Sequence, residues 1–436
     1  MKFFNEFFNS VNSEKKLKCI SDFIFYTFFL DKMSEEKVAK RSKKEGLRFH
    51  VIGFPHTELK PEYSWCAYTQ KARCIIIMLE SFGHKVFVYD GPKYSSCIQP
   101  STLQSIPPTW NYNNEFWKQM AAKVLPVLMT NVLENDIILL ATSSQYDIAL
   151  SVLTSVKIIP IEFGIGYSGI IAPYRVFESI EWMHTVWGHM NGTESDGNTN
   201  CTVIQNSFDT TYLYRRLLVS SESSEQCIPY LFYIGRIIER KGIFRAVEIA
   251  KATKMRLIVA GKGDDEERMK QYCNNLHVDA VFVGLVSGEQ KRVLFENAQA
   301  TIVMTQYIGP FEGVHIESML CGTPVLTTTW GVFCTTVQNG INGFKVLDAG
   351  EAIYAVDACG KMTEDHRRKI AENAYDKYSI FSRKQDPQTH EPECAALKYH
   401  VFFSRVFAHE CYETEKKRRD NENKPEILHV RAPGTW

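Results

Sequence analysis

The 436-residue sequence predicts an α/β protein with two doubly wound domains in tandem. Short apolar runs alternate with stretches of helical spacing over about residues 48–162, and the alternation restarts over about 230–327. Because the short runs are apolar on both faces, each sheet should be parallel and covered by helices on both sides. A polar stretch containing Gly, Ser and Glu, near 190–228, separates the two series and predicts the linker.

The first series predicts four strands, each a short apolar run bounded by polar or turn residues. They cover residues 49–54, 85–89, 136–141 and 157–162. A helix is expected over 68–82, where Ala72, Ile75 and Leu79 share one face and Gly83 ends the pattern. A second helix is expected over 116–133.

The second series predicts strands over 230–234, 256–260, 280–283, 300–304 and 324–327. Helices are expected over 243–254, 289–297, 315–320 and 364–379, and one more within 394–417. The chain therefore divides into four predicted parts: an N-terminal extension (1–46), a first domain (47–205), a second domain (206–385), and a C-terminal helix and tail (386–436).

The extension is rich in Phe and contains an apolar run at 20–30. This run has about half of the roughly 20 residues that a membrane span needs. We expect a covering helix or a loose extension, with weak peripheral membrane contact as the alternative.

Composition limits the partners and the compartment. The 50 basic and 50 acidic residues balance, which argues against a broad electrostatic surface for nucleic acid. The 12 cysteines form no CxxC pair, so we expect reduced thiols, a cytoplasmic location and no zinc site.

A glycine pattern follows the fourth strand. Gly164-Ile-Gly-Tyr-Ser-Gly169 matches GxGxxG, which is typical of dinucleotide sites. It lies outside the first strand–helix unit, and the acid expected about 20 residues later at a strand end is missing. A dehydrogenase is therefore a disfavoured alternative. Close approach of the backbone to some other ligand and an ordinary turn both remain open.

The second domain carries two cations beside glycines. In Gly235-Arg-Ile-Ile-Glu-Arg-Lys-Gly242, Arg236 and Lys241 lie in a loop between a strand and a helix. Such a loop suits a pyrophosphate, which needs several donors and charge neutralisation. An exposed basic turn is the alternative.

A third segment, 305–325, contains a predicted helix start. Gly313 and Val314 precede the helix expected over 315–320, whose first amides could hold a phosphate. Glu317 lies one turn further, where a carboxylate could accept two ribose hydroxyls. Alternatively, Glu317 only complements the helix dipole.

Taken together, these motifs resemble the retaining GT-B glycosyltransferases of family four, the group-one glycosyl transferases. The resemblance covers about residues 48–385 and depends on the order and spacing of five segments: 235–242, 257–263, 283–285, 317–324 and 339–344.

The resemblance implies two Rossmann-like domains that face a cleft and bind a UDP- or GDP-linked sugar as substrate, with no separate cofactor or metal. It assigns the diphosphate to Arg236 and Lys241, the ribose to Glu317, and the border of the base to Leu285. In the first domain it places Gly164 and Gly166 near the donor phosphates or the acceptor. His184 is a candidate near the transferred sugar, and His56 is a weaker one on the acceptor side.

One position departs from the family pattern. The family has two Glu eight residues apart, the first in Glu-Pro-Phe-Gly, where it contacts the donor sugar. Here the same place reads Gly309-Pro-Phe-Glu312, so the first acid is missing and an acid stands where the family has Gly. Glu312 is therefore a candidate for a catalytic role from a shifted position.

We expect a retaining, metal-independent transferase of the hexosyltransferase type that acts in glycan biosynthesis. The acceptor would be a hydroxyl of a glycan, a glycoprotein or another molecule. The sequence contains no DxD triplet, which disfavours the metal-dependent GT-A fold. The alternative is a weak or inactive glycosyltransferase-like module that only binds a nucleotide-sugar or glycan.

Overall fold

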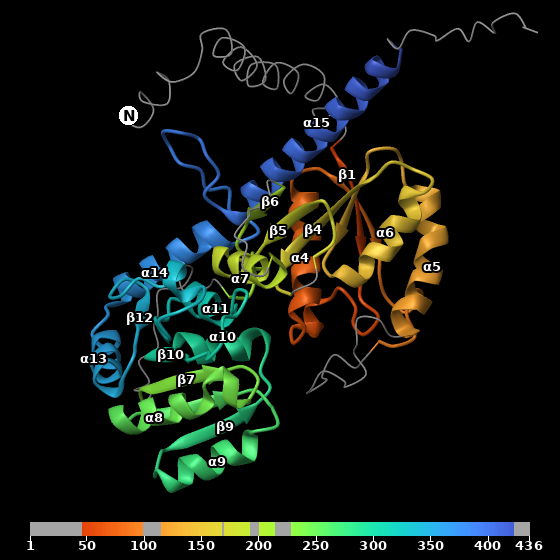
Figure 1. Cartoon of the computed structure of the whole chain (residues 1–436). Helices are drawn as coiled ribbons and strands as arrows, with labels where there is room; N and C mark the ends of the chain where they lie inside the picture. The colour runs from red at the N-terminus through yellow and green to blue at the C-terminus, as the bar shows by residue number, and fades with distance from the viewer. Residues whose placement is uncertain (1–45, 99–114, 168–169, 192–199, 214–227, 423–436) are drawn as a thin grey trace, which may run out of the picture.

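The computed structural model describes residues 46–98, 115–167, 170–191, 200–213 and 228–422. Two six-stranded sheets, each with helices packed on it, form the two halves of the protein (Figure 1). All the pairings between their strands are parallel. The predicted fold class, two Rossmann-like domains in tandem, is confirmed.

The first sheet has the strand order β2-β1-β3-β4-β5-β6. Its strands are β1 (Arg48–Ile52), β2 (Lys85–Tyr89), β3 (Ile137–Leu140), β4 (Ile159–Ile165), β5 (Tyr174–Phe177) and β6 (Cys201–Val203). The first four were predicted, and every residue of β3 and β4 is buried, including Glu162 of β4. The last two were not predicted, because Arg175 and Thr202 interrupt these short apolar runs.

Four helices accompany this sheet: α4 (Ala67–Ser81), α5 (Glu115–Asn131), α6 (Tyr146–Leu153) and α7 (Ile180–Asn191). The two predicted helices correspond to α4 and α5. Glu178 lies between β5 and α7.

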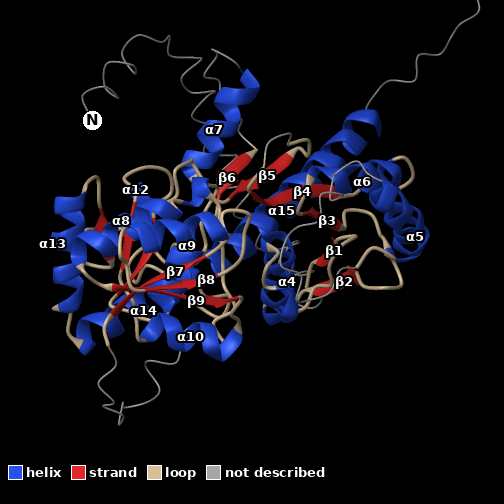
Figure 2. Ribbon diagram, turned by 90° about the horizontal axis from the view of Figure 1, so that it is seen from below, coloured by secondary structure: helices blue, strands red, loops and turns tan. Residues whose placement is uncertain are grey.

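The second sheet has the order β12-β11-β10-β7-β8-β9. Its strands are β7 (Tyr230–Ile234), β8 (Arg256–Ala260), β9 (Ala280–Gly284), β10 (Ala300–Val303), β11 (Val325–Thr327) and β12 (Gly343–Lys345). Its helices are α8 (Ile243–Thr253), α9 (Glu266–Asn275), α10 (Gly288–Glu296), α11 (Val314–Leu320), α12 (Phe333–Thr336), α13 (Ala349–Gly360) and α14 (Glu364–Tyr378). Figure 2 shows β7, β8 and β9 side by side, with helices around them.

The long helix α15 (Ala395–Glu422) follows the second domain in sequence but packs on the first (Figure 1). Ala395, Ala396 and Phe403 are buried in the same hydrophobic core as β1 and β3. The rings of Phe403 and Phe49 meet edge to face, 5.2 Å apart. The first domain therefore includes residues from both ends of the described chain.

Within the described ranges, no helix combines the length and the apolar character needed to cross a membrane. The predicted N-terminal extension and its membrane contact concern residues that lie, apart from Gly46, outside those ranges.

Candidate functional site

The loop after β7 brings Lys241 to the carboxyl end of β10. Lys241 closes a short 3-10 turn (Glu239–Lys241), and Gly242 follows with a left-handed φ of +76°. A Cβ at residue 242 would lie 1.9 Å from the carbonyl oxygen of Met304, directly after β10. Glycine is therefore required for the two backbones to approach this closely.

Lys241 pairs there with Glu312. The Lys241 Nζ donates to Glu312 Oε2 at 2.5 Å, and the Thr305 hydroxyl donates to the same oxygen at 3.2 Å. The Glu312 side chain is only 7% exposed, whereas that of Lys241 is 20% exposed. The face of Tyr307 lies 5.1 Å from the same ammonium. The ion pair is thus mostly shielded from water, and solvent or a ligand can reach it at the Lys241 side chain.

The backbone at Glu312 is unusual, with a φ of +60°. A left-handed conformation is uncommon for a non-glycine residue and needs support from its surroundings. His315 supplies it, because its Nδ1 donates to the Glu312 carbonyl oxygen at 2.5 Å. Burial lowers the pKa of His315 to about 4, so the ring is neutral at pH 7.

The Glu312 side chain fills the space beside Gly309. A Cβ at residue 309 would lie 2.1 Å from Glu312 Oε1. A carboxylate therefore occupies the place next to residue 309, although it comes from three residues further along the chain.

A second ion pair lies at α11. Glu317 Oε1 accepts from Lys291 Nζ of α10 at 2.6 Å, and both side chains are slightly less than one-fifth exposed. Sequence reasoning singled out Glu317 but missed Lys291, which lies 26 residues earlier on a helix with no motif of its own.

The first domain meets the 309–312 loop directly. A Cβ at Gly166, just after β4, would lie 3.1 Å from Pro310 Cβ, and the Ser179 hydroxyl donates to the Pro310 carbonyl at 2.7 Å. The predicted glycine segment therefore borders the loop that carries Glu312. Gly169, the last residue of the pattern, lies outside the described residues.

A buried ion pair lies next to this contact, on the side of the first domain. Lys71 of α4 donates to the Gly164 carbonyl at 2.9 Å and pairs with Glu178. The Lys71 and Glu178 side chains are 13% and 3% exposed. Sequence reasoning missed the pair because 107 residues separate its members.

The other candidates occupy varied positions. Arg236 and Leu285 are exposed in the loops after β7 and β9. Val314 is the first residue of the seven-residue helix α11, and Gly313 is its N-cap. His184 is exposed on α7, with its ring 5.8 Å from that of Trp187. His56 is buried, which lowers its pKa to about 4. No contact in the described residues joins either histidine to Lys241 or Glu312.

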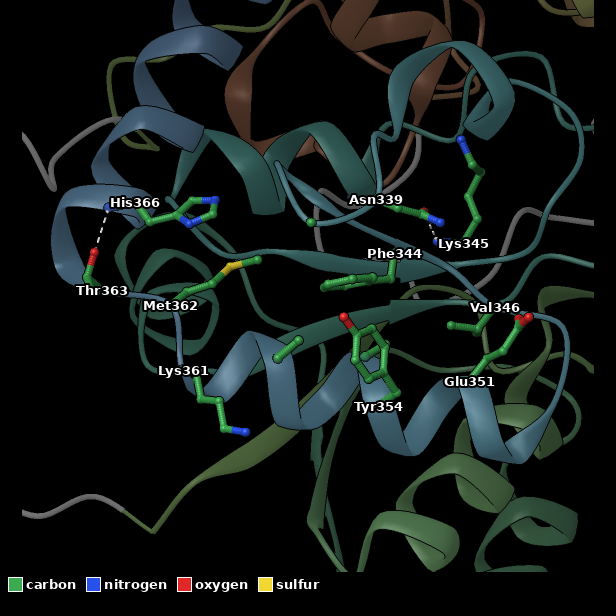
Figure 3. A pocket seen from close by; sticks show the side chains of 13 residues that line it. Asn339, Phe344, Lys345, Val346, Glu351, Tyr354, Lys361, Met362, Thr363 and His366 are labelled. Carbon is green, nitrogen blue, oxygen red and sulfur yellow. Dashed lines mark hydrogen bonds between the residues drawn. The ribbon is translucent and has the colours of Figure 1, made fainter.

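A pocket of about 610 Å³ lies elsewhere on the second domain, between β12, α13 and the start of α14 (Figure 3). It is lined by residues such as Phe344, Tyr354 and His366, and it contains none of the predicted site residues. In the part of the chain that the structure describes, no three His, Cys, Asp or Glu side chains gather as a metal site.

Two Rossmann-like domains in tandem, each with a parallel sheet, are the architecture of the GT-B class of fold. Solved structures of this class resemble the chain at low identity. Sucrose-phosphate synthase from Thermosynechococcus elongatus has a TM-score of 0.59 at 16% identity, covering 83% of this chain and 100% of its own. A glycosyltransferase involved in avilamycin A biosynthesis has a TM-score of 0.56 at 17% identity, covering 83% and 98%. HepE of Anabaena, solved in complex with UDP, has a TM-score of 0.53 at 16% identity, covering 77% and 96%.

The sequence points to one family within this class. Residues 221–377 match the family described as glycosyl transferases group 1, which confirms for this part of the chain the resemblance found in its motifs.

Two curated relatives match a similar length of chain. An uncharacterized glycosyltransferase of Methanocaldococcus jannaschii is 29% identical over 163 residues, which are 34% of this chain and 41% of the relative. The lipopolysaccharide 1,2-N-acetylglucosaminetransferase of Salmonella typhimurium is 27% identical over 168 residues, which are 35% and 44%. The chain thus matches less than half the length of either relative.

Proposed function

We propose that the protein is a glycosyltransferase that moves a sugar from a UDP- or GDP-linked donor to a hydroxyl acceptor. The observation that carries this proposal is the position of Lys241, at the carboxyl ends of β7 and β10 and next to the loop that touches the first domain. Open α/β sheets bind ligands outside the carboxyl ends of their strands.

In this proposal, Lys241 and the exposed Arg236 neutralise the diphosphate that leaves during transfer. Positioned cations at developing negative charge are usually among the largest contributions to catalysis. They would do so without a metal ion, in line with the absence of a DxD triplet from the sequence. Glu317 would accept hydrogen bonds from the ribose, and Leu285 would border the base.

The transfer would retain the anomeric configuration. The acceptor hydroxyl oxygen bonds to the anomeric carbon as the bond from that carbon to the diphosphate oxygen breaks, and the hydroxyl proton passes to the leaving phosphate. Gly166, beside Pro310, and Gly313 and Val314, at the start of α11, would offer backbone groups to the phosphates. His184 stays a prediction for the first-domain side of the transferred sugar.

Two observations on other proteins support the donor class. HepE of Anabaena, with the same fold, was solved with UDP and with UDP-glucose. The Salmonella relative is named for the transfer of N-acetylglucosamine to lipopolysaccharide. We accordingly propose a hexosyl donor and a glycan or glycoconjugate acceptor. Buried cysteines such as Cys74, Cys273 and Cys359 form no disulfide, in keeping with the cytoplasmic location that we propose.

The alternative proposal is a module that binds a nucleotide-sugar without turnover, and Gly309 is the observation that favours it. Incubation with common nucleotide-sugars, followed by assay of free nucleoside diphosphate, separates the two. Release that Lys241→Ala abolishes supports the enzyme. Tight binding without release supports the module, and binding of NAD instead would contradict both.

A further inference from the structure

The ammonium group that the proposed function assigns to the diphosphate already has an anionic partner. Glu312 Oε2 lies 2.5 Å from Lys241 Nζ, and only 7% of the Glu312 side chain is exposed. A carboxylate and a phosphate bind an ammonium in the same way, through charge-assisted hydrogen bonds. Glu312 thus holds the position in which a diphosphate oxygen would meet Lys241.

This arrangement depends on two residues together. A side chain at residue 309 would collide with Glu312, because even a Cβ there would lie 2.1 Å from its Oε1. The carboxylate reaches this space from a left-handed residue whose carbonyl is held by His315. The exchange of acid and glycine between positions 309 and 312 therefore creates the contact with Lys241.

We propose that Glu312 is an internal counter-ion, which a diphosphate must displace from Lys241, and that it thereby sets the affinity of the site for its donor. This inference rests on the proposed function. Two anions beside one ammonium repel each other strongly where water is scarce. The incoming diphosphate must therefore either move the Glu312 carboxylate or bind against its charge.

Displacement of the carboxylate has a defined local route. Glu312 loses its contact with Lys241 Nζ and with the Thr305 hydroxyl, which share the same carboxylate oxygen. The backbone contact with His315 involves the Glu312 carbonyl and can persist. The side chain can thus rotate while the 309–312 loop stays in contact with the first domain through Pro310.

The test is calorimetric titration of the full chain with UDP, GDP and inorganic pyrophosphate. Glu312→Gln keeps the shape of the side chain and removes its charge. We therefore expect at least one of these ligands to bind to this variant about tenfold more tightly than to the wild type. Glu248→Gln is the matched control: it removes the same charge from the same domain, at an exposed pair with Arg245. We expect the control to bind like the wild type.

A second variant guards against a folding defect in the first. Glu312→Gly removes both the charge and the cost of the left-handed backbone, so it should fold at least as well as the wild type and show the same gain in affinity. Binding that is equal to or weaker than wild type in both variants overturns the inference and leaves the proposed function standing. If no ligand binds to any of the proteins, the proposed function fails as well.

Discussion

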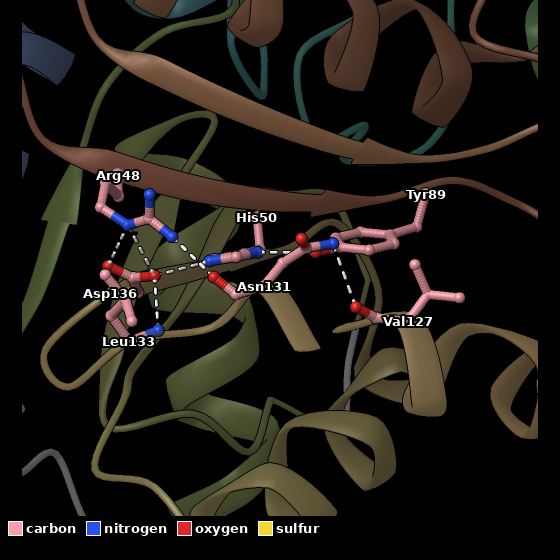
Figure 4. Close-up of polar contacts among 7 residues, drawn as sticks. All are labelled: Arg48, His50, Tyr89, Val127, Asn131, Leu133 and Asp136. Atoms are coloured by element: carbon pink, nitrogen blue, oxygen red, sulfur yellow. Dashed lines mark hydrogen bonds and ion pairs between the residues drawn. The ribbon is translucent and has the colours of Figure 1, made fainter. Parts of the chain in front are cut away.

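Each domain contains a cluster in which a basic side chain pairs with an acidic one, but the two clusters differ in position. In the first domain, Asp136 accepts from Arg48 Nε at 3.0 Å and lies 2.9 Å from His50 Nε2, while the other nitrogen of His50 lies 2.9 Å from the Tyr89 hydroxyl (Figure 4). In the second domain, Lys241 pairs with Glu312 at 2.5 Å. By residue type, the Asp–His–Tyr set looks more like a catalytic group than the Lys–Glu pair.

The positions of the two clusters on their sheets indicate the opposite. Arg48 begins β1 and Asp136 immediately precedes β3, so their ion pair lies at the amino edge of the sheet. His50 in β1 and Tyr89 at the end of β2 continue the cluster into the core, where His50 is fully buried. Asp136 also accepts from the Leu133 amide, so each group of this cluster is satisfied within the protein. Lys241 lies at a carboxyl edge and is partly exposed. Location and solvent access, more than residue type, therefore distinguish a site from a structural network.

The largest expected effect is on the second cluster. Lys241→Ala should lower kcat/KM for the nucleotide-sugar by about 10²–10³, because one positioned cation facing the leaving group is lost. Steady-state release of nucleoside diphosphate measures this. Lys241→Ala combined with Glu312→Gln is the control for the carboxylate left unpaired, and activity within a factor of about ten of wild type in that double variant would contradict the role.

The first cluster should respond in stability instead. Asp136→Ala leaves His50 and Arg48 without their buried acceptor, so we expect the free energy of unfolding to fall by about 3 kcal/mol. Urea denaturation measures this, with Asp357→Ala, at an exposed pair with Lys361, as a control with little effect. If Asp136→Ala instead lowers turnover per folded molecule without lowering stability, the cluster around Asp136 is a functional site, and the distinction drawn between the two clusters is wrong.

The next prediction concerns Arg236, which is exposed in the same loop as Lys241. Arg236→Ala should weaken binding of the nucleoside diphosphate by about tenfold, because one charge-assisted contact to the diphosphate is lost. Calorimetry measures this, and Arg245→Ala in the same domain serves as the control. An unchanged dissociation constant for Arg236→Ala would refute its role.

The smallest effect concerns pH. Burial lowers the pKa of His315 to about 4, while the unfolded chain titrates near 6.5. Between these values the unfolded state binds more protons, so this contribution to stability is complete above pH 6.5 and is lost as the pH falls toward 4. For His315 alone we expect about 1 kcal/mol between pH 7 and 5.5. Urea denaturation over this range should give a shallower pH dependence for His315→Gln, and an equal slope would contradict the prediction.

The sequence predicted the two sheets because most strands are short, largely apolar runs, as in β3 and β7. It did not predict β5, β6 or β12, because Arg175 interrupts the first, Thr202 the second, and Gly343 and Lys345 flank a single apolar residue in the third. The missing acid at Gly309 could be recognised from an eight-residue spacing. The contact of Glu312 with Lys241 could not, because it joins residues 71 apart and depends on one left-handed torsion.

The return of α15 to the first domain has a consequence for synthesis of the protein. The ribosome makes all the described strands of both sheets before it reaches Phe403, yet Phe403 packs against Phe49 of the first strand. The second sheet and its helices are complete in the growing chain by Tyr378, so this later half can fold while the earlier half still lacks part of its interior. The usual order of assembly from the amino terminus is thus reversed for the final step.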